Sequence, residues 1–195
     1  MIFKEKTLES EYIYRGKIIN LRRDRVTVKN GESTREIVEH SGGAVIMALK
    51  PDGNVLMERQ FRKPVEKVIF EAPAGKIDKG EAPMETALRE LKEETGYSAA
   101  NIRLLTSTYT TVGFSDEILY IYLCTDLIQG ETEFDENEAV DLEEHHINDL
   151  FEMTVSGKII DAKTQIGIFM VKALIDKGEL NLEVTVIMEK LNGNK

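Results

Sequence analysis

The pattern of apolar and polar positions along the chain predicts a largely β-structured protein. Short strands with polar faces are expected within residues 12–40, interrupted at residues 29–33, with Ile37 and Val38 in the second strand. Apolar runs at residues 44–49 and 55–61 flank the turn sequence PDGN, which predicts a hairpin. Further strands are expected at residues 67–71, 102–109, 118–125 and 139–142.

Helical spacing interrupts this pattern at residues 83–95, where a proline lies in the first turn and Gly96 follows the last turn. The apolar positions of this helix are Met84, Ala87, Leu88 and Leu91. Two more helices are expected, one capped by Asn148 and ending near residue 155, the other capped by Asp161 and ended by Gly178. Residues 180–195 fit either a strand or a helix.

Composition narrows the class of protein. The 195 residues are 42% hydrophobic, which suffices for one well-filled core with a small additional lobe. Asp and Glu outnumber Lys and Arg by 35 to 25, and the net charge of −10 argues against a nucleic-acid partner. The sequence lacks both a signal peptide and the roughly 18 apolar residues of a membrane span, so we expect a cytoplasmic protein with no membrane partner. Cys124 is expected to be a buried strand residue.

The predicted central helix carries three clustered acids. Glu90, Glu93 and Glu94 stand at spacings of three and four residues and therefore share one face of the helix. Like charges at this spacing destabilise a helix by a few tenths of a kcal/mol per pair, a cost that a bound divalent cation would reverse. Carboxylates without His or Cys suit Mg²⁺, with Mn²⁺ as an alternative.

The same helix completes a longer motif, GKIDKGEAPMETALRELKEETGY, at residues 75–97. Its fixed positions are Gly75, Glu81, Arg89, Glu90, Glu93, Glu94 and Gly96, with apolar side chains at Leu91 and Tyr97. Such a combination should arise by accident on the order of once in 10⁵ chains of this size. It resembles the signature box of the Nudix hydrolases, which hydrolyse a nucleoside diphosphate linked to another group.

The resemblance implies an α/β fold, an α/β/α sandwich around a mixed β-sheet, with a small N-terminal β lobe. Residues 1–41 would form the lobe, which in the family builds a homodimer and contributes to a shared substrate site. Residues 42–195 would form the Nudix hydrolase domain.

Roles within the box also follow from the resemblance. The metal ligands would be Glu90, Glu93 and Glu94, with Glu81 in support and the Ala74 carbonyl as a further ligand. Arg89 is expected to orient these carboxylates, since it can reach Glu81 across the loop and Glu85 and Glu93 along the helix. Gly75 would permit a tight loop next to the metal. The general base would come from the later acidic loop, with Glu138 the first choice and Glu136 the second, beside the catalytic Glu93.

Segments outside the box resemble the ADP-ribose pyrophosphatase branch of the family. They supply as substrate-binding candidates Arg35, Arg59, Arg62, Glu71, Asp116 and Glu117. Guanidinium groups suit phosphate and ribose oxygens. The expected reaction is Mg²⁺-dependent hydrolysis of ADP-ribose to AMP and ribose 5-phosphate. A pyrophosphatase for GDP-mannose or another nucleotide sugar is the alternative, and a non-catalytic nucleotide-sensing module is the second.

Overall fold

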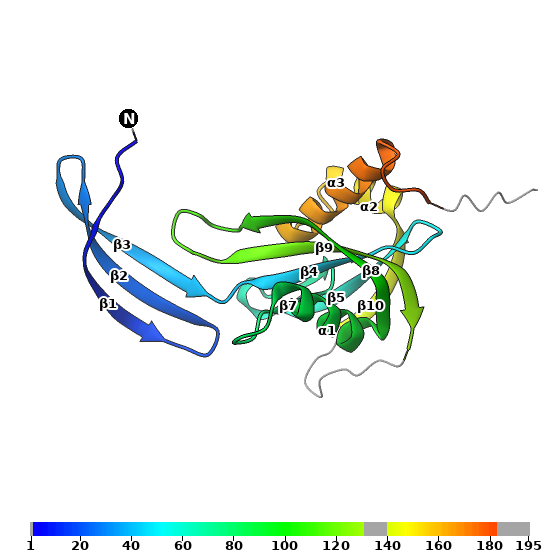
Figure 1. Cartoon of the computed structure of the whole chain (residues 1–195), viewed down its shortest axis with the longest axis horizontal. Helices are drawn as coiled ribbons and strands as arrows, with labels where there is room; N and C mark the ends of the chain where they lie inside the picture. The colour runs from blue at the N-terminus through cyan, green and yellow to red at the C-terminus, as the bar shows by residue number, and fades with distance from the viewer. Residues whose placement is uncertain (1, 131–139, 183–195) are drawn as a thin grey trace, which may run out of the picture.

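The computed structural model describes residues 2–130 and 140–182. An N-terminal lobe of three strands projects from a larger body of sheets and helices (Figure 1). The lobe contains β1 (Thr7–Arg15), β2 (Ile19–Val28) and β3 (Gly31–His40), paired antiparallel in that order. The sequence predicted shorter strands, but β2 and β3 pair along ten residues each without a break. Only Lys29 and Asn30 separate the two strands.

The body contains two sheets. A four-stranded mixed sheet has the order β7-β4-β9-β8, in which β4 and β9 run parallel. A three-stranded antiparallel sheet has the order β10-β5-β6. The strands are β4 (Gly43–Ala48), β5 (Asn54–Arg62), β6 (Lys67–Glu71), β7 (Ala74–Lys76), β8 (Tyr97–Tyr109), β9 (Ile118–Gln129) and β10 (Val140–His146).

The predicted hairpin between the two apolar runs after residue 43 is wrong. β4 and β5 follow one another in the chain but belong to different sheets, and the Leu49–Val55 bridge joins them. Both edges of β4 are already occupied, by β7 on one side and β9 on the other. The turn chemistry was read correctly, since Gly53 adopts a positive φ of 87°, but the turn redirects the chain into the second sheet.

Strand β4 shows how the layers are assembled, because its six residues are all buried. Val45 and Met47 face a core that contains Ile147, Leu150, Ile168 and Val171 from α2 (Ile147–Val155) and α3 (Ala162–Asp176). Ala44, Ile46 and Ala48 face a second core that contains Ala87 and Leu91 from α1 (Pro83–Thr95). Helices therefore cover opposite faces of the mixed sheet, as the α/β/α expectation required (Figure 1).

The helix ends follow the local sequence with one exception. Helix α1 ends at Gly96, whose φ of 73° suits glycine, and Asp161 caps α3 by accepting a hydrogen bond from the Thr164 N–H. Helix α2 begins two residues earlier than predicted, because the His146 side chain and not Asn148 accepts the capping hydrogen bond. Within the described residues, no helix is long and apolar enough to span a membrane.

Candidate active site

Arg89 is the centre of the acidic cluster. Its Nε donates to Glu81 Oε1 at 2.9 Å, and its Nη1 donates to Glu90 Oε1 at 2.7 Å and to Glu93 Oε2 at 2.9 Å. Glu85, which the sequence offered as another partner, accepts a hydrogen bond from the Ala82 N–H at the start of the helix. The arginine therefore contacts three predicted metal ligands, as expected of a residue that orients carboxylates.

The ion pairs of this cluster shift the pKa values of its members. Hydrogen bonds from Arg89, supported by the Thr86 hydroxyl, lower the pKa of Glu81 to about 2, although partial burial opposes the shift. The same contacts raise the pKa of Arg89 above its ordinary value. Glu81 is therefore ionised throughout the neutral range.

The strand β7 lies directly against the acidic helix. The Ala74 N–H donates to Glu94 Oε2 at 3.1 Å, and Glu94 is buried. A Cβ on Gly75 would overlap Glu90 Oε1, whereas Cβ atoms in proteins essentially never approach another heavy atom to less than 3.0 Å. The sequence assigned Gly75 to a tight turn, whereas the structure shows that the glycine makes room for Glu90.

A divalent cation is implied by the resemblance, and the donor chemistry fits it. Glu81, Glu90, Glu93, Glu94 and the Ala74 carbonyl are hard oxygen donors, and Gly75 leaves space for one of these carboxylates beside β7. Across residues 2–130 and 140–182, however, the side chains of three or more His, Cys, Asp or Glu residues do not yet converge as metal ligands. Glu90 and Glu93 are turned to Arg89, so an incoming cation would compete with that guanidinium.

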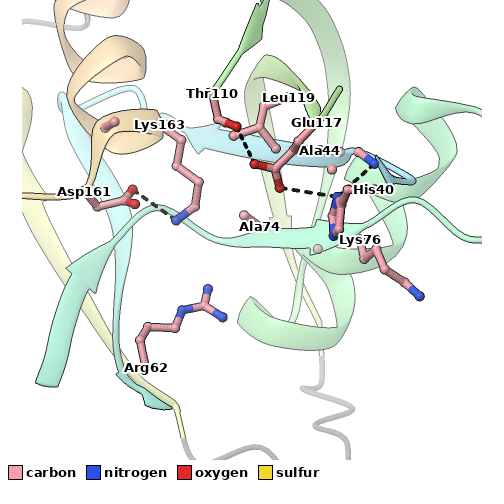
Figure 2. Close-up of a pocket in the computed structure, with 14 residues that line it drawn as sticks. His40, Ala44, Arg62, Ala74, Lys76, Thr110, Glu117, Leu119, Asp161 and Lys163 are labelled. Carbon is pink, nitrogen blue, oxygen red and sulfur yellow. Dashed lines mark hydrogen bonds and ion pairs between the residues drawn. The ribbon is translucent and has the colours of Figure 1, made fainter. Parts of the chain in front are cut away.

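An open cavity of about 330 Å³ lies beside β7 (Figure 2). Ala74 and Gly75 form part of its wall, so the cavity adjoins the acidic cluster through this short strand. The polar side chains that line it are His40, Arg62, Lys76, Thr110, Glu117, Asp161 and Lys163. Arg62 and Lys163 lie on one side of the cavity and Lys76 lies beside His40 (Figure 2), and these three cations suit an anionic ligand.

Arg62 is fixed to this wall by a buried carboxylate. Its Nε and Nη2 donate to the two oxygens of Glu71, at 2.7 and 3.0 Å, and Glu71 is only 1% exposed. Lys163 forms a second ion pair with Glu71 and lies 3.0 Å from Asp161 Oδ2. Burial alone would raise the pKa of Asp161, but Lys163 and two hydrogen bonds from Thr164 lower it below its ordinary value.

A loop between β8 and β9 forms the opposite wall. The Thr110 hydroxyl donates to Glu117 Oε2 at 2.6 Å, and Glu117 Oε1 lies 3.3 Å from His40 Nδ1. Asp116 accepts a hydrogen bond from the His40 N–H at 2.9 Å, so it holds the end of β3. Of the two predicted acids in this loop, Glu117 faces the cavity and Asp116 anchors the lobe to the body.

Two predicted arginines lie elsewhere. Arg59 forms an ion pair with Glu143 and stacks over the Phe70 ring, 4.9 Å from its centroid. Arg35 forms an ion pair with Glu5 in the N-terminal lobe, which projects from the body of the molecule (Figure 1). Neither is among the described residues that line the cavity. The predicted bases, Glu138 and Glu136, lie outside the described residues.

The sequence interpretation named none of Lys163, Lys76, Thr110 and His40 as a site residue. Lys163 carried a signal, because it occupies the first turn of a helix, where the positive end of the helix dipole disfavours a cation. The other three stand in strands or at their ends without an unusual local pattern. Their position on one cavity follows from strand pairing between distant segments.

Comparison with known proteins identifies the family. The sequence profile of the NUDIX domain matches residues 39–164, and that of the nucleoside diphosphate sugar hydrolase N-terminal domain matches residues 5–38. The chain belongs to the Nudix family. The second match coincides with β1, β2 and most of β3.

Several Nudix relatives cover most of the chain. It is 44% identical to an ADP-ribose pyrophosphatase of Bacillus subtilis, over 83% of this chain and 89% of that protein. It is 42% identical to a methanol dehydrogenase activator of Bacillus methanolicus, over 86% of this chain and 92% of that protein. A solved structure of an ADP compounds hydrolase has the same fold, with a TM-score of 0.80 at 21% identity over 92% of this chain and 99% of the other.

Proposed function

We propose that this Nudix hydrolase cleaves the diphosphate of ADP-ribose to give AMP and ribose 5-phosphate. The observation that carries the proposal is the position of β7. Its residues Ala74 and Gly75 contact the acidic cluster and also line the cationic cavity. A diphosphate placed against β7 would therefore meet carboxylates that can hold a cation and side chains that can bind phosphate oxygens directly.

The acidic side would hold the cofactor. Divalent cations are the general cofactor of Nudix hydrolases, and we propose Mg²⁺, with Mn²⁺ as an alternative, on Glu90, Glu93 and Glu94 with Glu81 and the Ala74 carbonyl. Bound there, the ion would neutralise diphosphate charge and acidify a water molecule. Arg89 keeps these carboxylates gathered on one face of α1.

The cationic side would hold the substrate. Arg62 presents a guanidinium that Glu71 fixes through two hydrogen bonds, so little conformational entropy is lost when it binds an anion. Glu117 could accept hydrogen bonds from a ribose hydroxyl on the opposite wall. The relatives named ADP-ribose pyrophosphatase, in Bacillus subtilis and Mycobacterium tuberculosis, support adenine as the base.

We also propose that the protein forms a homodimer through its N-terminal lobe. Strand β1 is exposed along its whole length, and the lobe exposes large apolar side chains at Leu8, Tyr12, Ile13, Tyr14 and Ile18. Apolar groups gathered on one small lobe are typical of an interface. Arg35 would then serve the site of the second copy. Light scattering should give about twice the chain mass of 22.1 kDa, and a monomer would contradict the proposal.

The activity is tested by incubating the protein with Mg²⁺ and, separately, ADP-ribose, GDP-mannose and nucleoside triphosphates, and separating the products by chromatography. AMP and ribose 5-phosphate should form with wild type, and Glu93→Gln should abolish them. Glu152→Gln, an exposed position on α2, is the matched control. GMP and mannose 1-phosphate would assign a different nucleotide sugar, and no turnover of any compound would support a non-catalytic module.

A further inference from the structure

Lys163 is an unusual cation for its position. It lies in the first turn of α3, its side chain is only 13% exposed, and it pairs with Glu71 and Asp161. A lysine there opposes the helix dipole and also loses hydration. Helix formation therefore does not explain why a lysine occupies this position.

The two carboxylates do not need Lys163 as a structural partner. Glu71 already accepts two hydrogen bonds from Arg62. Asp161 already accepts hydrogen bonds from the Thr164 N–H at 3.0 Å and the Thr164 hydroxyl at 2.6 Å. Each acid would thus keep charged or hydrogen-bonding partners without the lysine.

Lys163 and Arg62 are held close together on the cavity wall. Both bond to the same Glu71 atom, Oε2, so the two nitrogen atoms lie within about 6 Å of each other, the sum of two ordinary hydrogen-bond lengths. Both residues line the 330 Å³ cavity. Figure 2 shows the Lys163 side chain extending from α3 and the Arg62 side chain from β5, both toward the segment that carries Ala74.

We propose that Lys163 binds the diphosphate of the substrate directly, as a second cation beside Arg62. The inference rests on the proposed function and assigns the residue that completes its phosphate site. An ammonium group has three N–H donors, of which Glu71 and Asp161 take two, and the third serves the cavity that Lys163 lines. Asp161, which shares this wall, also accepts two hydrogen bonds from Thr164, so it does not depend on Lys163 alone when the ammonium binds a phosphate.

The test compares Lys163→Met, which keeps most of the length of the side chain but removes the charge, with Lys163→Arg, which keeps the charge. Lys67→Met is the matched control, because Lys67 is exposed near the same ion-pair network but does not line this cavity. Steady-state kinetics with ADP-ribose and Mg²⁺ give KM and kcat. Calorimetry with inorganic pyrophosphate and Mg²⁺ gives an affinity that does not depend on turnover.

Lys163→Met should raise KM and weaken pyrophosphate binding by about 10- to 100-fold each, with a smaller change in kcat, since a charge-assisted hydrogen bond to the bound anion is lost. Lys163→Arg should recover most of the affinity, and Lys67→Met should match wild type. Urea unfolding should show that Lys163→Met remains folded under assay conditions.

Pyrophosphate affinity within threefold of wild type in Lys163→Met would overturn the assignment. Equal losses in Lys163→Met and Lys67→Met would also overturn it, because they would reflect general surface charge. Failure of the proposed function is a separate result: wild type would then bind pyrophosphate without hydrolysing ADP-ribose, and the calorimetry would still decide the role of Lys163.

Discussion

Gly75→Ala should separate activity from stability. The new Cβ would overlap the Glu90 carboxylate, and restoring a 3.0 Å contact requires that carboxylate to move by more than about 1 Å. The φ angle of Gly75 lies outside the left-handed region, so alanine can adopt the backbone conformation without strain. The flexible end of Glu90 can yield while the fold is maintained.

The magnitudes follow from this geometry. A displacement of about 1 Å in a residue that positions the reacting groups can cost on the order of 10²-fold in kcat/KM. Stability should change by at most about 1 kcal/mol, because an off-rotamer glutamate and a weakened Arg89–Glu90 ion pair oppose the entropic gain from replacing glycine. For a chain of this size that is a shift of about 2–4 °C in Tm.

Gly157→Ala is the reciprocal control. Gly157 has a φ of 75° in the turn after α2, and a Cβ there meets no atom within 4 Å. Alanine should cost about 1–2 kcal/mol through backbone strain and leave kcat/KM unchanged. The assays are ADP-ribose hydrolysis and thermal unfolding of both variants. An unchanged kcat/KM in Gly75→Ala would refute the proposal that the position of the Glu90 carboxylate beside Gly75 matters for the reaction.

Three further outcomes are expected. Cys124 should resist iodoacetamide until the protein is unfolded, because burial raises the pKa of its thiol to about 12; mass spectrometry of native protein showing rapid labelling would contradict this. Gly167→Val should destabilise the protein by about 1–3 kcal/mol in urea unfolding, since a Cβ would stand 2.9 Å from Met47 Cγ and closer still to its sulfur; an unchanged midpoint would disprove tight packing of α3 on β4. Glu143→Gln should remove a stabilisation that depends on pH. The hydrogen bond from Arg59 lowers the pKa of Glu143, so its contribution is present above the unfolded-state pKa of about 4.3 and is lost as pH falls through the lower folded-state value. The difference in urea midpoint between wild type and variant should therefore disappear in acid. A difference that grew as the pH fell would contradict a lowered pKa of Glu143 in the folded protein.

Local sequence was sufficient for the acidic side of the site. The box residues, the limits of α1 and the gathering of carboxylates on Arg89 all depend on residues within about two dozen positions of one another. Helical periodicity and the glycine that ends the helix encode that arrangement directly. The role of Gly75 was assigned incompletely, because its contact with Glu90 requires knowing that β7 packs against α1.

Local sequence was insufficient wherever a partner lies far along the chain. The turn after β4 was recognised, yet the hairpin was wrong, because a turn motif does not state which strand its flanks will pair with. Lys163 was missed for the same reason, since Glu71 is 92 positions away. Arg62, by contrast, was named from the resemblance, and the structure places it on the cavity.

The sequence by itself thus determined the family, the central helix and the acids that it presents, since these depend on spacing along one element. Tertiary structure decided which polar side chains share the cavity beside those acids. Arg62, His40 and Lys163 come from β5, the end of β3 and the start of α3, and strand pairing and helix packing bring them to one cavity. Those contacts are set by burial of the β4 faces against helices on both sides, a property of the assembled core that no single segment carries.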